Sequence, residues 1–422
     1  MMKMIVDFWI RPSFSNYDWV NIVFYCTILC LGAFLGSFVS VFVISGAVYG
    51  SLHLVTGRLN WALPAPVKLV YLSFCGFFVA DLIAAAFHPS WIAFGEVVEN
   101  LPFLGFAAIY SITFVDRERL LSAVEITAAA ASFVAAAVTP FVGLLVVADE
   151  NLQYYRPELA AGNPNVLALL GGILLVLNIG AVVRRWNSGY WIHLAAAACA
   201  FYLVSATGTR GLWPILFAVP LLGLCFLPIK KHILWGLPIV ALLLLGLFAL
   251  VATYSDSIKH RIETAGIDIH SIYSGELTSS IGQRVQIYKA GLELFVEKPL
   301  LGYGPGNERQ EIGRKTFDAG GVAVSFSHSH NAFLNAALRA GIVGVVALAG
   351  VLVVPLVIGL RAKKDDVGRA GFFTLCGILL VYSCSGIVGL LLGNDIHDAV
   401  YIAAVCYALY LVFGRAEAAI PG

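Results

Sequence analysis

The chain reads QRVQIYKAGLELFVEKPLLGYGPGN at residues 283–307 and SFSHSHNAFLNAALRAGIVG at residues 325–344, with a polar segment between them. This stretch concentrates arginine, histidine, glycine and asparagine, whereas the sequence on either side consists mostly of long apolar runs. The contrast predicts a scaffold of apolar helices and one polar segment, residues 283–344, that carries the chemistry.

The composition indicates a membrane protein. Of the 422 residues, 60% are hydrophobic and only 12% are charged, whereas soluble domains carry about 25% charged residues. The mean hydropathy is +0.87. These values predict an all-α polytopic membrane protein and exclude a large soluble enzyme. The net charge of +1 argues against a nucleic-acid partner, which requires a concentrated basic face.

The apolar runs predict about twelve membrane-spanning helices, because a span needs ~20 mostly apolar residues. We expect nine of them in residues 1–254, a large loop with short helices in residues 255–329, and three more spans in residues 330–422. The first apolar run, from Trp19 to Val55, is too long for a cleavable signal peptide. The expected spans are 19–36, 38–56, 66–87, 92–114, 119–147, 164–183, 190–208, 211–229, 232–254, 331–360, 370–392 and 397–414.

Lysine and arginine residues in the short loops set the expected orientation, because such residues gather on the cytoplasmic side of a membrane. Their alternation between successive loops places both ends of the chain in the cytoplasm and the loop 255–329 outside. Arg156 and Arg210 fall in short external loops, against this pattern, and so need a specific reason to be there.

Two arginines are candidate ligands for an anion. Arg210 lies in TGTRG at residues 207–211, and Arg284 opens a helix with one apolar face, expected at 284–297 and ended by Pro299. A guanidinium group binds a phosphate through two parallel hydrogen bonds. From position alone, Arg210 fits an anchor at the membrane surface equally well, and Arg284 fits an ordinary solvated arginine.

A segment of two histidines, a serine and an asparagine precedes an apolar helix at His328–Asn331. Ser329 or Asn331 can cap that helix, whereas a histidine at a membrane surface can act as a general base near neutral pH. A metal site needs further ligands, and no other Cys, His or carboxylate cluster has the spacing, so we expect neither a metal nor another cofactor. A histidine beside arginines suggests transfer from a phosphate-activated donor, but these residues alone fit a transporter equally well.

These motifs resemble those of the O-antigen ligase and polymerase superfamily of bacterial envelope glycosyltransferases. Tyr288 stands where the family often has tryptophan. The resemblance covers about the C-terminal two-thirds of the chain and implies a GT-C-like fold with one large periplasmic loop. The segments that carry it are TGTRG at 207–211, AGNPN at 161–165, RVQIYKAG at 284–291, KPLLGYGPGN at 298–307 and HSHNAFLNAALRAGIVG at 328–344.

The resemblance implies a reaction and a role for three residues. A glycan on undecaprenyl pyrophosphate is moved to an acceptor hydroxyl on the periplasmic side of the bacterial inner membrane, by inverting transfer without a metal ion. His330 is then the general base on the acceptor hydroxyl. Arg210 and Arg284 hold the pyrophosphate and stabilise the charge that develops on it, in place of the usual divalent ion.

Four other residues are weaker candidates. Asn331 either orients His330 or caps the helix, and we expect the cap. Arg156 either contacts a phosphate or is solvated. Arg339 lies within an apolar helix, where an arginine is a functional candidate by default, although packing near the interface explains it equally well. His328 is a weaker candidate base than His330.

The resemblance leaves the acceptor open. We expect an O-antigen ligase, which joins the glycan to lipid A-core. A Wzy-type polysaccharide polymerase extends a lipid-linked chain, and a protein O-oligosaccharyltransferase modifies a protein, with the same donor and motifs. A transporter of lipid-linked sugars places its polar sites at mid-membrane on broken helices, whereas the polar residues here gather at the external face.

Overall fold

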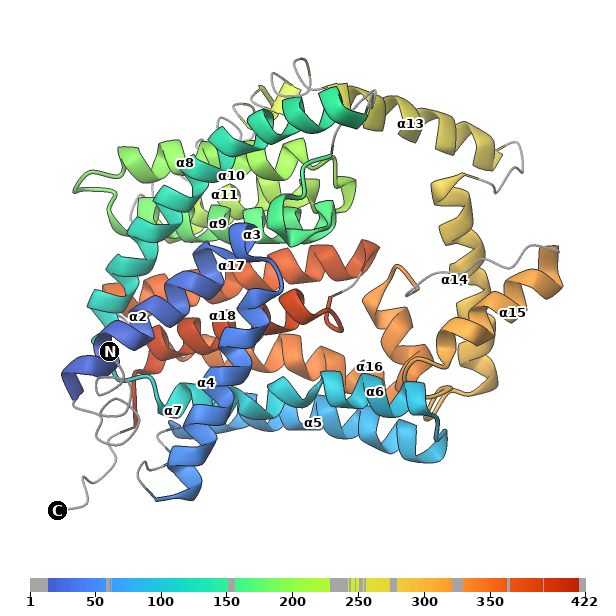
Figure 1. Cartoon of the computed structure of the whole chain (residues 1–422), viewed down its shortest axis with the longest axis horizontal. Helices are drawn as coiled ribbons and strands as arrows, with labels where there is room; N and C mark the ends of the chain where they lie inside the picture. Colours follow the sequence, from blue (N-terminus) through green and yellow to red (C-terminus); the bar gives the residue numbers. More distant parts are fainter. Residues whose placement is uncertain are drawn as a thin grey trace.

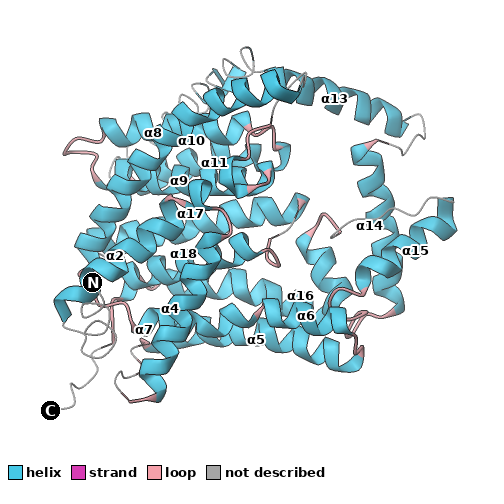
Figure 2. Cartoon of the chain, viewed as in Figure 1, coloured by secondary structure: helices cyan, strands magenta, loops and turns pink. Residues whose placement is uncertain are grey.

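The computed structural model describes residues 14–57, 61, 63–150, 156–227, 256–273, 279–320, 329–362, 365–389 and 391–416, with a few positions between 242 and 253. In these residues the chain forms helices and connecting loops, without a strand (Figure 2). His328 lies outside the described residues.

The helices before the expected external loop run through the first part of the chain. They are α2 (Phe14–Cys30), α3 (Gly32–Leu35), α4 (Phe38–Val55), α5 (Ala65–Phe87), α6 (Trp91–Glu99), α7 (Phe106–Ser111), α8 (Arg117–Glu150), α9 (Pro164–Arg184), α10 (Trp191–Ala206) and α11 (Trp213–Phe226). Short 3₁₀ turns lie at Leu101–Gly105, Leu159–Ala161 and Arg210–Leu212. The later helices are α13 (Asp256–Tyr273), α14 (Ser280–Glu297), α15 (Glu308–Gly320), α16 (Ala332–Gly359), α17 (Asp366–Val388) and α18 (Asp395–Phe413).

Eight helical segments in the described part of the chain are long and apolar enough to cross a membrane, and three shorter apolar helices accompany them. All of these segments fall on expected spans, so the chain is an all-helical polytopic membrane protein. The remaining expected span, 232–254, lies mostly outside the described residues, and the total of twelve crossings stays a prediction. The eight segments are Phe38–Val55, Ala65–Phe87, Trp91–Ser111, Arg117–Leu145, Pro164–Arg184, Ala332–Gly359, Asp366–Val388 and Asp395–Phe413.

The span expected at 92–114 is not one continuous helix. It is divided into α6, a 3₁₀ turn and α7. Pro102 falls in the turn and has no N–H to continue the helical ladder. Asn100 caps the end of α6, and its amide donates to a carboxylate oxygen of Asp81 on α5 at 2.8 Å. A polar contact to α5 therefore lies at this break.

Helices α9 and α18 form the centre of the molecule. In an 18-residue window of each, 94% is buried inside the protein. α9 packs against α8, α10, α11 and α17, and α18 packs against α17, α2 and α4. Small residues allow these close approaches, since a Cβ atom on Gly377 of α17 would lie 2.5 Å from the Cγ1 atom of Val176 on α9. The core thus fixes both helices.

The described residues of the expected loop form α13, α14 and α15, which lie together on one side of the molecule (at the right in Figure 1). α14 contains the helix expected at 284–297 and ends two residues before Pro299. A second, smaller core joins α14 and α15 to α16. Its buried members are Ile287, Leu294, Tyr303, Ile312 and Leu338.

Helix α16 is interrupted at Ala340 and Gly341, where the backbone leaves helical geometry. The glycine-rich turn that follows α14 binds at this break. The backbone N–H of Tyr303 donates to the carbonyl of Leu338 at 2.8 Å, and that of Gly304 donates to the carbonyl of Arg339 at 3.0 Å. The turn therefore satisfies carbonyl groups that the interrupted helix leaves open.

Two glycines make this contact possible. A Cβ atom on Gly302 would lie 2.3 Å from the carbonyl oxygen of Leu338, and one on Gly341 would lie 2.2 Å from the backbone of Leu300. Both glycines have a positive φ, of 62° and 61°, which residues with a side chain adopt at a cost. The turn consequently fixes the first part of α16, which begins two residues after His330.

Candidate functional site

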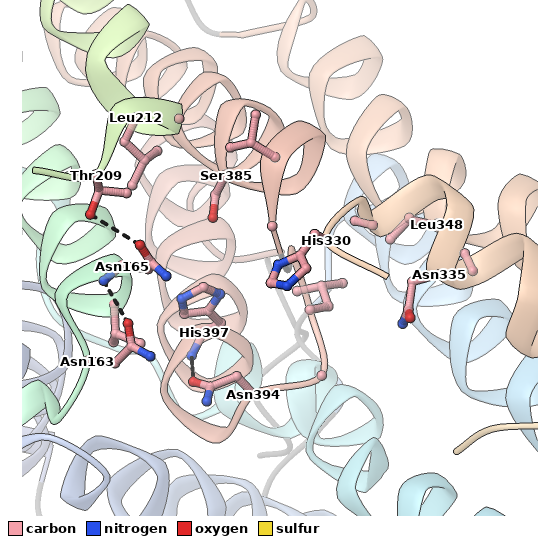
Figure 3. Close-up of a pocket in the computed structure, with 18 of the residues that line it drawn as sticks. Asn163, Asn165, Thr209, Leu212, His330, Asn335, Leu348, Ser385, Asn394 and His397 are labelled. Atoms are coloured by element: carbon pink, nitrogen blue, oxygen red, sulfur yellow. Dashed lines mark hydrogen bonds between the residues drawn. The ribbon is translucent and has the colours of Figure 1, made fainter. Parts of the chain in front are cut away.

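A cavity of about 750 Å³ lies where several helices begin. Its walls come from the first turns of α9 and α18, from the turn before α11, from α13, α14 and α16, and from α5 and the end of α6. Three residues predicted to act together, Arg210, Arg284 and His330, all line it. Figure 3 shows His330 between Thr209 on one side of the view and Asn335 on the other.

Three asparagine caps start helices at the cavity. Asn163 accepts a hydrogen bond from the backbone N–H of Asn165 at 2.8 Å at the start of α9. Asn331 accepts from the N–H groups of Phe333 and Leu334, both at 3.0 Å, at the start of α16. Asn394 caps α18 in the same way. Because helix N-termini carry partial positive charge, their convergence favours a bound anion.

His330 has an unusual backbone conformation for a residue with a side chain. Its φ angle is +55°, which costs roughly 1–3 kcal/mol and persists only where the surroundings impose it. The Tyr288 hydroxyl donates to the carbonyl of His330 at 2.9 Å. Burial raises the pKa of that hydroxyl, so it stays a donor at neutral pH. The buried Ser329 hydroxyl donates to the carbonyl of Asn331 at 2.9 Å. These bonds hold His330 at the cavity wall.

The turn that carries Arg210 is held by the AGNPN segment. The Thr209 hydroxyl donates to the side-chain oxygen of Asn165 at 3.2 Å (Figure 3). Arg156 donates to the carbonyl of Thr207 at 3.0 Å and approaches the hydroxyl of Thr209 at 3.4 Å. Arg156 also lines the cavity. These contacts give a structural reason for Arg156: its guanidinium binds the backbone of the turn that presents Arg210.

Arg210 and Arg284 keep positive charge available at the cavity. Arg210 approaches Asp268 of α13, with 3.5 Å between Nη2 and Oδ2, while its buried Nη1 has no hydrogen-bond partner in the described part of the chain. Arg284, in the second turn of α14, has neither an ion pair nor a hydrogen bond to any side chain or backbone group that the structure describes. Two partly unsatisfied guanidinium groups in one cavity suit a phosphate-bearing ligand.

Arg339 lines the same cavity but its charge is compensated. Its two terminal nitrogens lie 2.7 Å from a carboxylate oxygen of Asp81 and 2.7 Å from one of Glu96. Arg309 of α15 lies 2.7 Å from the other oxygen of Glu96. This buried ion-pair cluster joins α5, α6, α15 and α16. These ion pairs give Arg339 a structural reason to lie in an apolar helix, and its functional role stays a prediction.

Glu308 completes the ion-pair cluster from α15. It is 1% exposed, and its Oε1 atom lies 3.9 Å from Nε of Arg309, too far for a hydrogen bond. Burial raises the pKa of this carboxyl to about 7, although the nearby Arg339 and Arg309 lower it. The docking of the loop helix α15 on the membrane helices thus includes a group that titrates near neutral pH.

Several polar residues of the cavity were not predicted from the sequence. His397 lines it and is 4% exposed, and Asn335 and Ser385 also face it. The signal was present at residues 394–398, where NDIHD interrupts an apolar run, and polar residues within such a run are functional candidates. Among the residues that the structure describes, no three His, Cys, Asp or Glu side chains lie close enough together to hold a metal ion.

Comparison with known proteins supports the family resemblance. Residues 194–349 match the protein-family model described as O-antigen ligase. An uncharacterized protein of Haemophilus influenzae is 23% identical over 198 residues, which cover 46% of this chain and 49% of the relative. The chain therefore spans about half the length of that relative. The resemblance inferred from the motifs is confirmed over the segment that contains Arg210, Arg284 and His330.

Proposed function

We propose, from the match of residues 194–349 to the O-antigen ligase family model, that this chain is an O-antigen ligase. It transfers a glycan from undecaprenyl pyrophosphate to a hydroxyl group of lipid A-core. The reaction inverts the configuration at the sugar carbon and uses no metal ion. The enzyme lies in the bacterial inner membrane, and its cavity faces the periplasm.

One observation carries this proposal. Arg210, Arg284 and His330 come from three segments that are far apart in the chain, and all three line one cavity. The nearest pair in sequence, Arg284 and His330, is separated by 46 positions (330 − 284). Two arginines with charge available and a histidine are the groups that transfer from a lipid pyrophosphate to a hydroxyl requires.

In the proposed reaction the histidine and the arginines have different roles. The imidazole of His330 takes the proton of the acceptor hydroxyl as its oxygen attacks the anomeric carbon of the glycan. The bond between that carbon and the pyrophosphate oxygen breaks on the opposite face, and its electron pair stays on the pyrophosphate. Arg210 and Arg284 bind the charge that develops there, and the N-termini of α9, α16 and α18 add to the positive field.

The membrane arrangement follows from the same proposal. Twelve spans in a GT-C-like fold, with both chain ends in the cytoplasm, put α13, α14 and α15 in the periplasm. The cavity is then open to a lipid-linked donor from the membrane and to an acceptor from the periplasm. The ion-pair cluster of Asp81, Glu96, Arg309 and Arg339 joins the periplasmic helices to this membrane scaffold.

A transfer assay with one defined donor and three acceptors tests the proposal. The purified chain receives an undecaprenyl-pyrophosphate-linked glycan with lipid A-core, with a second lipid-linked repeat, or with an acceptor protein. Transfer to lipid A-core supports the ligase. Preferential transfer to the second repeat identifies a polymerase, and transfer to protein identifies an O-oligosaccharyltransferase. A donor that stays intact with all three rules out glycan transfer.

The same assay tests the metal-free reaction. We expect transfer to continue at the same rate in excess chelator, because the guanidinium groups neutralise the pyrophosphate. Transfer that stops in chelator and returns with a divalent cation contradicts this part of the proposal.

A further inference from the structure

We infer that Asp268 is a positioning residue that acts through Arg210 and limits how tightly the enzyme holds the pyrophosphate. This inference rests on the proposed function, because it assigns Arg210 to the pyrophosphate. Its consequence is that the lipid pyrophosphate product leaves the cavity fast enough for repeated turnover.

Asp268 lies beside Arg210, one of the residues that line the cavity. It is 3% exposed and belongs to α13, which packs against α10 and α14. Ala265 lies one helical turn earlier and lines the cavity. The same face of α13 therefore meets both the cavity and the guanidinium of Arg210.

The contact between the two charges is an ion pair without a hydrogen bond. The Nη2 atom of Arg210 lies 3.5 Å from Oδ2 of Asp268, and Oδ2 has no hydrogen-bond donor in the part of the chain that is described. The carboxylate thus offsets part of the arginine's charge and leaves Nη1 of Arg210 to other partners. Arg284 has no such counter-ion among the described groups, so the two arginines differ in the charge that they present.

This difference matters for turnover. A pyrophosphate still attached to the glycan carries less charge than the pyrophosphate released by transfer. Uncompensated cations therefore hold the product more tightly than the donor. A buried carboxylate beside one of the two arginines weakens the attraction for the donor and for the product. The effect is larger for the product, because the product carries more charge.

The test compares Asp268→Asn with the unchanged chain. The probe is undecaprenyl pyrophosphate, and its dissociation constant is measured together with single-turnover and steady-state transfer. We expect Asp268→Asn to bind the pyrophosphate about tenfold more tightly. Its single-turnover rate stays near that of the unchanged chain, whereas its steady-state rate falls because product release becomes slower.

Two further variants separate this role from a general effect of charge or folding. Glu263→Gln removes an exposed acid from the same helix and leaves pyrophosphate affinity unchanged. Asp268→Glu keeps the charge and leaves the affinity within about threefold. If Asp268→Asn does not fold, the pyrophosphate affinity of Asp268→Glu is the deciding measurement. Loss of pyrophosphate binding in Asp268→Glu overturns the inference.

The results also separate this inference from the proposed function. If the unchanged chain binds pyrophosphate and transfers glycan, but Asp268→Asn binds the pyrophosphate equally or more weakly, only the inference about Asp268 fails. If the unchanged chain neither binds the pyrophosphate nor transfers glycan, both fail.

Discussion

At the scale of single residues, the arginines at the cavity are of two kinds. Some are paired with acidic side chains, and others keep positive charge available for a ligand. Arg339 and Arg309 are neutralised by Asp81 and Glu96. Arg284 keeps its charge free of the described acids, and Arg210 is only partly compensated by Asp268. Position in the sequence cannot separate these arginines, because the acids that pair with them come from distant helices.

We predict that Arg210→Lys and Arg284→Lys each weaken binding of the donor pyrophosphate about tenfold or more, because an ammonium group lacks the planar pair of donors. Binding of undecaprenyl pyrophosphate by each purified variant measures the effect. Arg314→Lys is the matched control, since the side chain of Arg314 is 67% exposed and pairs with Glu311 of its own helix. If both cavity variants bind undecaprenyl pyrophosphate with unchanged affinity, neither arginine binds the pyrophosphate.

At the scale of elements, the break in α16 fixes the geometry around His330. The glycine-rich turn after α14 donates two backbone hydrogen bonds to the open carbonyls of Leu338 and Arg339. Asn331 caps the start of the same helix, and the Tyr288 hydroxyl binds the backbone of His330. The glycine-rich turn thus serves to hold the helix that follows the histidine.

We predict that Gly341→Ala destabilises the protein by about 2 kcal/mol or more, because the residue has a positive φ and its new Cβ atom meets the backbone of Leu300. Thermal unfolding of the protein in detergent measures this loss. Gly350→Ala is the control on the same helix, where a Cβ atom meets only Ser73 at 3.9 Å. Equal unfolding temperatures for the two variants contradict the docking role of Gly341.

The sequence predicted the helices well and their pairing poorly. Runs of ~20 apolar residues identify spans without knowledge of their neighbours, and Pro299 correctly marked the end of α14. The segment 92–114 was predicted as one span interrupted by Asn100 and Pro102, and the structure divides it there into α6, a 3₁₀ turn and α7. The contact of Arg156 with Thr207 joins residues 51 positions apart, and a single sequence contains no signal for such a pairing.

At the scale of the whole molecule, the buried ion-pair cluster links the expected periplasmic helices to the membrane scaffold. Glu308 makes this link sensitive to pH. Burial raises its pKa from an ordinary value of 4.5 to about 7 in the folded protein. Between these values only the folded state keeps the proton, so the free energy of unfolding falls as the pH rises from about 5 to 7 and then levels off.

We predict that Glu308→Gln removes this dependence. The unfolding free energy of the unchanged chain falls relative to that of the variant by about 3 kcal/mol between pH 5 and pH 8. Unfolding temperatures of both proteins across this range measure the difference. If the unfolding temperatures of the two proteins change in parallel with pH, the assigned protonation of Glu308 is wrong. The ion pairs of Arg339 then account for the link between α15 and the membrane helices.

The proposed function of the whole molecule requires His330 to act as the base in a cavity that binds the donor through other residues. Single-turnover transfer by His330→Ala, with donor binding measured on the same sample, tests this claim most directly, and His270→Ala on α13 is the exposed control. We expect His330→Ala to transfer the glycan ~10²–10⁴-fold more slowly, with donor affinity unchanged, and we expect His270→Ala to transfer it at the rate of the unchanged chain. Transfer by His330→Ala at the rate of the unchanged chain would contradict this claim.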